Sequence, residues 1–321
     1  MNSLLTDELK KELSIDCNKE LERIVDFVRV SVKKMQKKGV VIGLSGGLDS
    51  SVCAYLLEKA LGKRRVLAVL LPERDSASIN HSHAHLIAEN LGLEIVECDM
   101  TQVLEDMGAY KIAKNQLKNK EEETKYIHTI QTGVNLIWGG YLYQDLFGDY
   151  YGEPTSTNWK IYKKLTEKAT YRELAFQFTK VRLRMVYLYF LADQRNYAVV
   201  GTTDKSEYST GIYCKYGDGA NDMQILRHLY KTQIRQLAQY INLPVEIIKK
   251  PNTADLYGNL PHSVFLGMSY EELDALLIGM EKGYSDRQLM EIVPLKGVES
   301  VRQLKKVGEF VKELPLLINR P

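Results

Sequence analysis

The chain has 321 residues and a formal net charge of +2, with 45% hydrophobic and 26% charged residues. This composition can form a full hydrophobic core, and we expect one large domain or a domain with appendages. The near-neutral charge provides no strong field for nucleic acid or for a membrane surface, so neither is predicted as a partner. The chain has four scattered cysteines, Cys17, Cys53, Cys98 and Cys214. They form no CxxC pair, so neither a zinc site nor a disulfide framework is favoured. Together with the lack of a signal-peptide pattern, this predicts a cytoplasmic protein.

The predicted elements alternate between strand and helix after an N-terminal helical segment at residues 1–38. Apolar runs and helical periodicity predict, in chain order, a strand at 39–44, a helix at 50–61, a strand at 65–71, a helix at 76–91, a strand at 93–98, a helix at 174–192, a strand at 197–202 and a helix at 229–243. Strands separated by helices favour an α/β fold, a parallel sheet with helices on both faces. Right-handed crossovers then place the carboxyl ends of the strands at one edge.

The α/β domain is expected to span residues 39–260, followed by a C-terminal helical segment at 261–321. An interval at about 110–172 interrupts the alternation and is rich in Tyr, Trp and Gly. We expect an ordered insertion or lid whose aromatic side chains pack on the main domain.

Small residues join the first predicted strand to its helix in the sequence SGGLDS, residues 45–50. Ser45, Gly46 and Gly47 allow a sharp turn, and the amides at the start of the helix favour an anionic ligand such as phosphate. The loop is not GxxxxGK[ST], because Asp49 stands where that motif needs lysine, and its glycines do not have GxGxxG spacing. It resembles the pyrophosphate loop of the N-type ATP pyrophosphatases, in which the aspartate would hold magnesium.

A second set of polar residues follows the strand at 197–202, in the sequence GTTDKSEYSTGIYCKYGDGANDM. By the parallel-sheet argument this segment leaves the same edge as the SGGLDS loop. Glu207 could therefore share a magnesium ion with Asp49. Lys215 and Lys231 could neutralise charge that develops as pyrophosphate leaves.

Taken together, these stretches resemble the ammonia-dependent NAD synthetases. The matching segments cover most of residues 40–280, and the run from 182 to 256 is specific to that family: SGGLDSS, LPERDS, KVRLRM, VVGTTDKSE, TGIYCKYGDGANDM, LYKTQIRQLA, KKPNTADL and GMSYEELD. The resemblance implies a Rossmann-like domain, usually a homodimer, that adenylates the carboxylate of deamido-NAD and lets ammonia displace AMP. ATP would be the co-substrate and Mg²⁺ the metal.

The resemblance also implies roles for individual residues. Asp49, Glu207 and Lys231 would form the catalytic set, with Asp49 and Glu207 on the metal. The positions implied to bind ATP are Gly43, Ser45, Gly46, Gly47, Asp49, Ser50, Thr202, Lys231 and Thr253. The dinucleotide substrate would contact Arg182, Lys215 and Asp222.

Two segments depart from the family pattern near the expected acceptor site. NLPHSVFLGMSY lacks the acidic pair that usually precedes the ELGxSY-like segment, and VKELPLLINRP lacks the usual His-Lys pair. An amide ligase acting on another small carboxylate is therefore an alternative. About 38 residues precede the first strand, too few for a glutaminase domain, so ammonia is expected from solution or from a separate glutaminase.

Two further hypotheses come from other functional classes. A tRNA-modifying enzyme would need a basic face or an RNA-binding domain, which the near-neutral charge disfavours. A non-catalytic nucleotide-binding module would not need Asp49 and Glu207.

The run HSHAH at residues 81–85 resembles a metal-binding tract. Side chains at positions i and i+2 of a helix point apart, so only His81 and His85 can share a face. We predict no metal site from this run alone.

Overall fold

The computed structural model describes residues 7–112, 156–251 and 266–312. Its centre is a five-stranded, all-parallel sheet with the order β3-β2-β1-β4-β5. The strands are β1 (Gly39–Gly43), β2 (Val66–Leu70), β3 (Glu94–Glu97), β4 (Tyr197–Gly201) and β5 (Met223–Gln224). The predicted α/β class with a Rossmann-like parallel sheet is confirmed.

Strand β1 lies at the point where the strand order reverses. Its central residue Val41 pairs with Leu67 of β2 on one side and with Val199 of β4 on the other. The chain runs outward from β1 to β2 and β3, and then returns to the opposite side of β1 to form β4. In open parallel sheets, ligands bind at such a switch point, outside the carboxyl ends of the strands. The loops after β1 and β4 are therefore the ones that can meet around a ligand.

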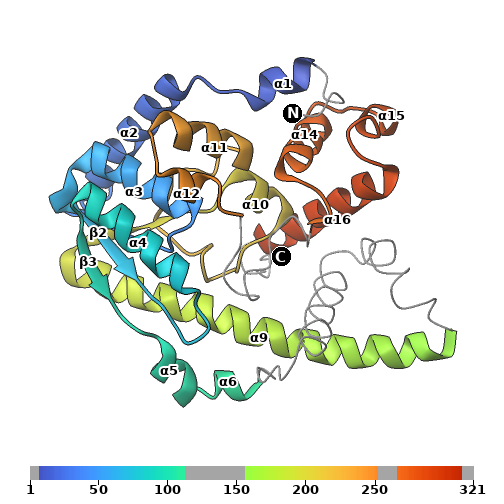
Figure 1. Cartoon of the computed structure of the whole chain (residues 1–321), viewed down its shortest axis with the longest axis horizontal. Coiled ribbons are helices and arrows are strands. Elements are labelled where there is room, and N and C mark those ends of the chain that lie inside the picture. The colour runs from blue at the N-terminus through green and yellow to red at the C-terminus, as the bar shows by residue number, and fades with distance from the viewer. Residues whose placement is uncertain (1–6, 113–155, 252–265, 313–321) are drawn as a thin grey trace, which may run out of the picture.

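Helices cover both faces of the sheet (Figure 1). On one face, α2 (Cys17–Lys34), α3 (Leu48–Leu61), α4 (Ser78–Leu91) and α11 (Lys231–Tyr240) share a core with Val40 and Ile42 of β1. On the other, α9 (Ser156–Arg195) packs Met185 and Leu188 against Val41. Alternate residues of β1 thus enter different cores, which explains why Val40, Val41 and Ile42 are all apolar and β-branched.

Two predicted helices begin earlier than their sequence pattern indicated. Helix α3 begins at Leu48 rather than residue 50, because Gly47 is its N-cap. Helix α9 begins at Ser156, so the last part of the 110–172 interval is helical. Residues 113–155 of that interval, and with them most of the proposed lid, lie outside the described residues. Shorter elements complete the domain: η1 (Lys63–Arg65), α5 (Thr101–Asp106), α6 (Ala109–Ile112), α10 (Lys205–Thr210) and α12 (Val245–Ile248).

The C-terminal segment forms a separate helical cluster, as Figure 1 shows. It contains α14 (Tyr270–Glu281), α15 (Asp286–Leu289) and α16 (Leu295–Lys312), as expected for a helical C-terminal segment. Helix α1 (Asp7–Leu13) buries Leu9 and Leu13 in this cluster, whereas α2 packs on the sheet. Residues 1–38 thus contribute to two cores. The predicted divisions at 38/39 and 260/261 stay predictions.

Helices α14 and α16 lie against α10, the short helix that follows β4. The C-terminal cluster therefore reaches the edge where the ligand loops gather. Within the described residues, no helix is both long and apolar enough to cross a bilayer.

Candidate active site

The SGGLDS loop turns sharply at Gly46, directly after β1. Gly46 has φ +69°, and a Cβ at this position would lie 2.1 Å from the backbone oxygen of Asn80 on α4. A positive φ and the absence of space together require glycine. The loop is therefore closely seated on the N-terminal part of α4.

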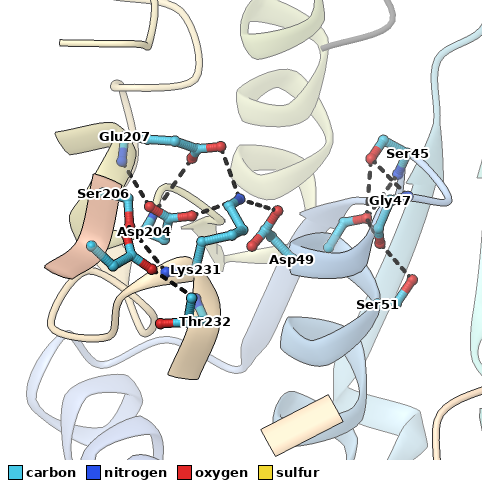
Figure 2. Close-up of polar contacts among 11 residues, drawn as sticks. Ser45, Gly47, Asp49, Ser51, Asp204, Ser206, Glu207, Lys231 and Thr232 are labelled. Carbon is cyan, nitrogen blue, oxygen red and sulfur yellow. Dashed lines mark hydrogen bonds and ion pairs between the residues drawn. The ribbon is translucent and has the colours of Figure 1, made fainter. Parts of the chain in front are cut away.

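The hydroxyl groups of the loop are held in place by its own backbone (Figure 2). Ser51 donates to the oxygen of Gly47 at 2.7 Å, and the hydroxyls of Ser45 and Ser50 lie 3.0 Å apart. Gly47 has no side chain with which to cap α3, and the first amides of a helix have no intrahelical acceptor. The loop thus presents amides and ordered hydroxyls at the positive end of a helix dipole, an arrangement that suits a phosphate group. We call residues 45–50 the phosphate loop.

Beside the loop, one buried lysine contacts three carboxylates. The Nζ atom of Lys231 lies 2.8 Å from Asp49, 2.6 Å from Asp204 and 3.0 Å from Glu207. The side chain of Lys231 is 1% exposed. Figure 2 shows the three carboxylates pointing toward this ammonium group, Asp49 from the start of α3 and the other two from the start of α10. We call these four residues the lysine–carboxylate cluster.

Helix termini position the members of the lysine–carboxylate cluster. Asp204 is the N-cap of α10 and accepts a hydrogen bond from the amide of Glu207 at 2.7 Å, which forms a capping box. Lys231 is the first residue of α11, and its amide donates to Ser206 at 3.0 Å. Asp274 of α14, fully buried, accepts from Thr232 at 2.9 Å. The C-terminal cluster therefore braces the two helix starts that carry the site.

Crowding of carboxylates perturbs the acid–base properties of the cluster. Burial, and then the charge of Glu207, raise the pKa of Asp204 to about 8. Burial likewise raises the pKa of Glu207 to about 7, against the opposing effect of Lys231. Burial alone would lower the pKa of Lys231, but the three carboxylates raise it well above its usual value. When all three carboxylates are ionised, they carry two more negative charges than Lys231 can neutralise.

The carboxylate oxygens are close enough to hold a cation together. One oxygen from each of Asp49, Asp204 and Glu207 lies within 4.8 Å of the others. The Oδ1 atom of Asp49 is buried and has no hydrogen-bond partner among the described residues. Three carboxylates with an unsatisfied oxygen form the ligand set that hard cations prefer.

A cavity of about 340 Å³ opens over both the loop and the lysine–carboxylate cluster. Helix α9 forms one wall through Arg184 and Leu188, and Lys250 contributes from the other side. Most residues predicted to bind ATP line this cavity: Gly43, Ser45, Gly47, Asp49, Ser50, Thr202 and Lys231, together with the predicted metal ligand Glu207. The structure thus brings together predicted site residues that are as far apart in the chain as Gly43 and Lys231.

The other predicted site residues lie outside the lining. Arg182 donates to the backbone oxygen of Lys215 at 3.3 Å, and the two residues are next in the chain to the lining residues Val181 and Cys214. Asp222 instead accepts from the amide of Val199 at 2.8 Å, along β4. Gly46 belongs to the loop but faces Asn80 of α4 instead of lining the cavity, and Thr253 lies outside the described residues. The substrate-binding roles of these residues stay predictions.

Three residues that the sequence analysis did not select contribute to the site. Asp204 was missed although its D-x-x-E spacing to Glu207 is a capping-box signal. Lys250, in the KKPNTADL segment, donates to the oxygen of Gly46 at 3.4 Å. For Asp274, no local pattern could have indicated its role, because its partners are 42 and 68 residues away.

Solved structures of related fold support the architecture. The chain is similar to an NMN synthetase from Francisella tularensis, with a TM-score of 0.69 and 22% identity, covering 95% of this chain and 100% of that one. It is also similar to an NH3-dependent NAD synthetase from Campylobacter jejuni, with a TM-score of 0.65 and 24% identity over 95% and 100% of the two chains. At these identities the likeness shows the fold.

The chain is more similar in sequence to other relatives than to these solved structures. An NH(3)-dependent NAD(+) synthetase from Thermotoga neapolitana is 35% identical over 302 residues, covering 93% of this chain and 96% of the relative. The NAD synthase family model matches residues 20–128 and 146–315. These segments include the phosphate loop and every member of the lysine–carboxylate cluster, and the chain therefore belongs to the NAD synthase family.

Proposed function

We propose that this protein amidates deamido-NAD with ammonia, using ATP to form a carboxyl-adenylate and releasing NAD, AMP and pyrophosphate. The observation that carries the proposal is the meeting of two features over one cavity. A phosphate-type loop follows β1, and the lysine–carboxylate cluster combines residues that follow β1, β4 and β5. A loop for pyrophosphate beside a buried cationic group suits cleavage between the α and β phosphates.

In this proposal the phosphate loop holds the departing pyrophosphate. The amides at the start of α3 and the hydroxyls of Ser45 and Ser50 would donate to its oxygens. Lys231 lies within hydrogen-bond distance of Asp49, so its ammonium group can turn toward negative charge that develops as the bond to the α phosphorus breaks. Stabilising developing charge with a preorganised cation is the main task of such a site.

Magnesium would be held by Asp49 and Glu207, with Asp204 beside them. The closely spaced carboxylate oxygens and the unpartnered Oδ1 atom of Asp49 fit a hard cation. When bound, the metal would neutralise phosphate charge and help orient ATP. Lys231 would then be released from part of its ion pairing and become available to the phosphates.

The reaction needs no side-chain nucleophile. A carboxylate oxygen of the substrate attacks the α phosphorus, the bond to pyrophosphate breaks, and ammonia then attacks the carbonyl carbon and expels AMP. The protein contributes mainly positioning and charge stabilisation. Arg182 and Lys215, each next in the chain to a lining residue, would contact the anionic dinucleotide, and so would Asp222.

We also propose the remaining features implied by the family. The protein would act as a homodimer in the cytoplasm, with ammonia supplied from solution or by a separate glutaminase. Thr253 and Thr202 would add contacts to ATP.

A second candidate is amidation of a different carboxylate by the same activating site. The sequence favours it at two places, since both the acidic pair before LGMSY and the C-terminal His-Lys pair are missing. The protein from Francisella tularensis shows that this fold also occurs in an enzyme described as an NMN synthetase. The acid precursor of NMN is therefore the first alternative substrate to test.

The test is an assay of purified protein with magnesium-ATP, ammonium and either deamido-NAD or nicotinate mononucleotide. AMP, pyrophosphate and the amide product are followed together, and Asp49→Ala is the control. We expect equal amounts of AMP and NAD, with both lost in the variant. Amide formed from nicotinate mononucleotide but not from deamido-NAD would establish the second candidate. ATP binding with no AMP from either acid would refute both.

A further inference from the structure

Away from the lysine–carboxylate cluster, two histidines and a glutamate converge between α4 and β3. His81 and His85 stand one turn apart on α4, and Glu97 is the last residue of β3. The Nε2 atom of His81 lies 2.8 Å from Oε1 of Glu97, and that of His85 lies 3.0 Å from Oε2. The two imidazole rings have centroids 4.6 Å apart. One carboxylate thus contacts both rings.

The fold, rather than the local sequence, brings these groups together. Helix α4 is the crossover between β2 and β3, and it packs Ala84 and Ile87 into the core on the sheet. Side chains four residues apart lie on one face of a helix, which aligns His81 with His85. Pairing of β3 with β2 then places Glu97 at the end of the sheet, within reach of both histidines.

We propose that His81, His85 and Glu97 bind a divalent transition-metal ion, for which zinc is the best match. Zinc is commonly coordinated by imidazole nitrogen together with carboxylate oxygen. Ligand atoms about 2.0 Å from a tetrahedral ion are about 3.3 Å from one another, so the observed contacts of 2.8 and 3.0 Å need to open only slightly. One donor atom from each residue already lies within 4.8 Å of the others.

The site is open to solvent and differs chemically from the lysine–carboxylate cluster. The side chains of His81 and Glu97 are each 39% exposed and that of His85 is 32% exposed, so an ion can enter directly and water can complete its coordination. Two imidazoles favour zinc over magnesium, whereas the all-carboxylate set of the cluster favours magnesium. The two sites would therefore hold different metals.

A metal ion here would fasten α4 next to the phosphate loop. The backbone oxygen of Asn80, the residue before His81, lies against Gly46 of the loop. His81 itself lines the wall of the cavity. By joining α4 to the end of β3, the ion would limit movement of the helix on which the loop is seated. This role does not depend on which acid the enzyme amidates.

The test is a calorimetric titration of the full chain with zinc ions, in the presence of excess magnesium, comparing His85→Gln and Glu97→Gln with the native protein. His228→Gln is the matched control, because His228 also pairs with one glutamate, Glu20, and its side chain is 35% exposed. We expect one zinc ion to bind at this site. Each of the two ligand variants should lower its affinity by at least about 100-fold, since loss of outer partners alone weakens metals by about 10–100-fold.

A second readout is the thermal midpoint, which zinc should raise in the native protein and in His228→Gln but not in the two ligand variants. Native circular dichroism in all variants would exclude misfolding as the cause. The proposal is overturned if the native protein binds no zinc. It is also overturned if His85→Gln and Glu97→Gln bind zinc as the native protein does, in which case the two histidines are only hydrogen-bonded to Glu97.

Discussion

Replacing Lys231 by methionine should separate the two roles of this side chain. Methionine keeps an unbranched chain but removes the ammonium group that contacts Asp49, Asp204 and Glu207 at 2.6 to 3.0 Å. In the ligand-free protein the change leaves three carboxylates without their counter-ion. Removing one partner of a buried ion pair lowers the free energy of unfolding by about 3–5 kcal/mol. The thermal midpoint should fall, and magnesium should restore part of it by replacing the lost positive charge.

The same variant should also lose catalytic power. Removing one group that stabilises transition-state charge lowers kcat by about 10²–10³-fold. The assay is the rate of AMP release at saturating ATP, measured at a temperature where circular dichroism shows the variant folded. Lys205→Met is the matched control, because Lys205 lies on neighbouring α10, pairs with Glu281 at 2.8 Å and does not line the cavity. If Lys231→Met keeps kcat close to that of Lys205→Met, Lys231 does not act on the leaving pyrophosphate.

Three other variants test the geometry of the site. Gly46→Ala should reduce kcat/KM for ATP by more than Gly47→Ala does. Of the two glycines, only Gly46 has a positive φ, and only its new Cβ would lie 2.1 Å from a backbone oxygen, that of Asn80. Equal reductions in initial-rate assays would contradict this. Asp274→Asn should lower the thermal midpoint. The amide nitrogen of the new side chain would face a buried donor, the backbone amide of Thr232 or the hydroxyl of Ser206, which lowers the free energy of unfolding by about 1–3 kcal/mol. An unchanged midpoint would show that the Asp274 carboxylate does not stabilise the starts of α10 and α11.

Asp204→Asn should flatten the pH dependence of stability in the ligand-free protein. The folded-state pKa of Asp204, about 8, is above the ordinary value of 3.8, so the folded protein retains a proton that the unfolded chain has lost, and stability falls as pH rises between these two values. The slope is at most about 1.4 kcal/mol per pH unit for one proton. Melting at several pH values checks this, and identical slopes in variant and native protein would refute it.

The features that sequence alone predicted are those encoded locally. The apolar run of β1 and the small residues of SGGLDS specify a strand, a turn and a helix start without help from distant segments. The alternation of strands and helices was then sufficient to place the loops after β1 and β4 at one edge, where the structure has them.

The features that were missed depend on contacts between distant segments. Asp204 has an ordinary capping signal, and only the fold shows that it is 0% exposed beside Lys231. Glu97 ends a short strand, and nothing in its neighbourhood indicates that it meets His81 and His85. The early start of α9 at Ser156 was hidden because the aromatic-rich interval carries no clear helical periodicity.

The proposed reaction requires that a carboxylate oxygen of the substrate attacks the α phosphorus of ATP. The most direct measurement is isotope transfer, with deamido-NAD labelled by oxygen-18 in its carboxylate and incubated with the enzyme, magnesium-ATP and ammonium. If the carboxylate attacks the α phosphorus, each NAD formed is accompanied by one AMP that carries one labelled oxygen, as detected by mass spectrometry. Label found in inorganic phosphate or pyrophosphate, with none in AMP, would rule out attack on the α phosphorus.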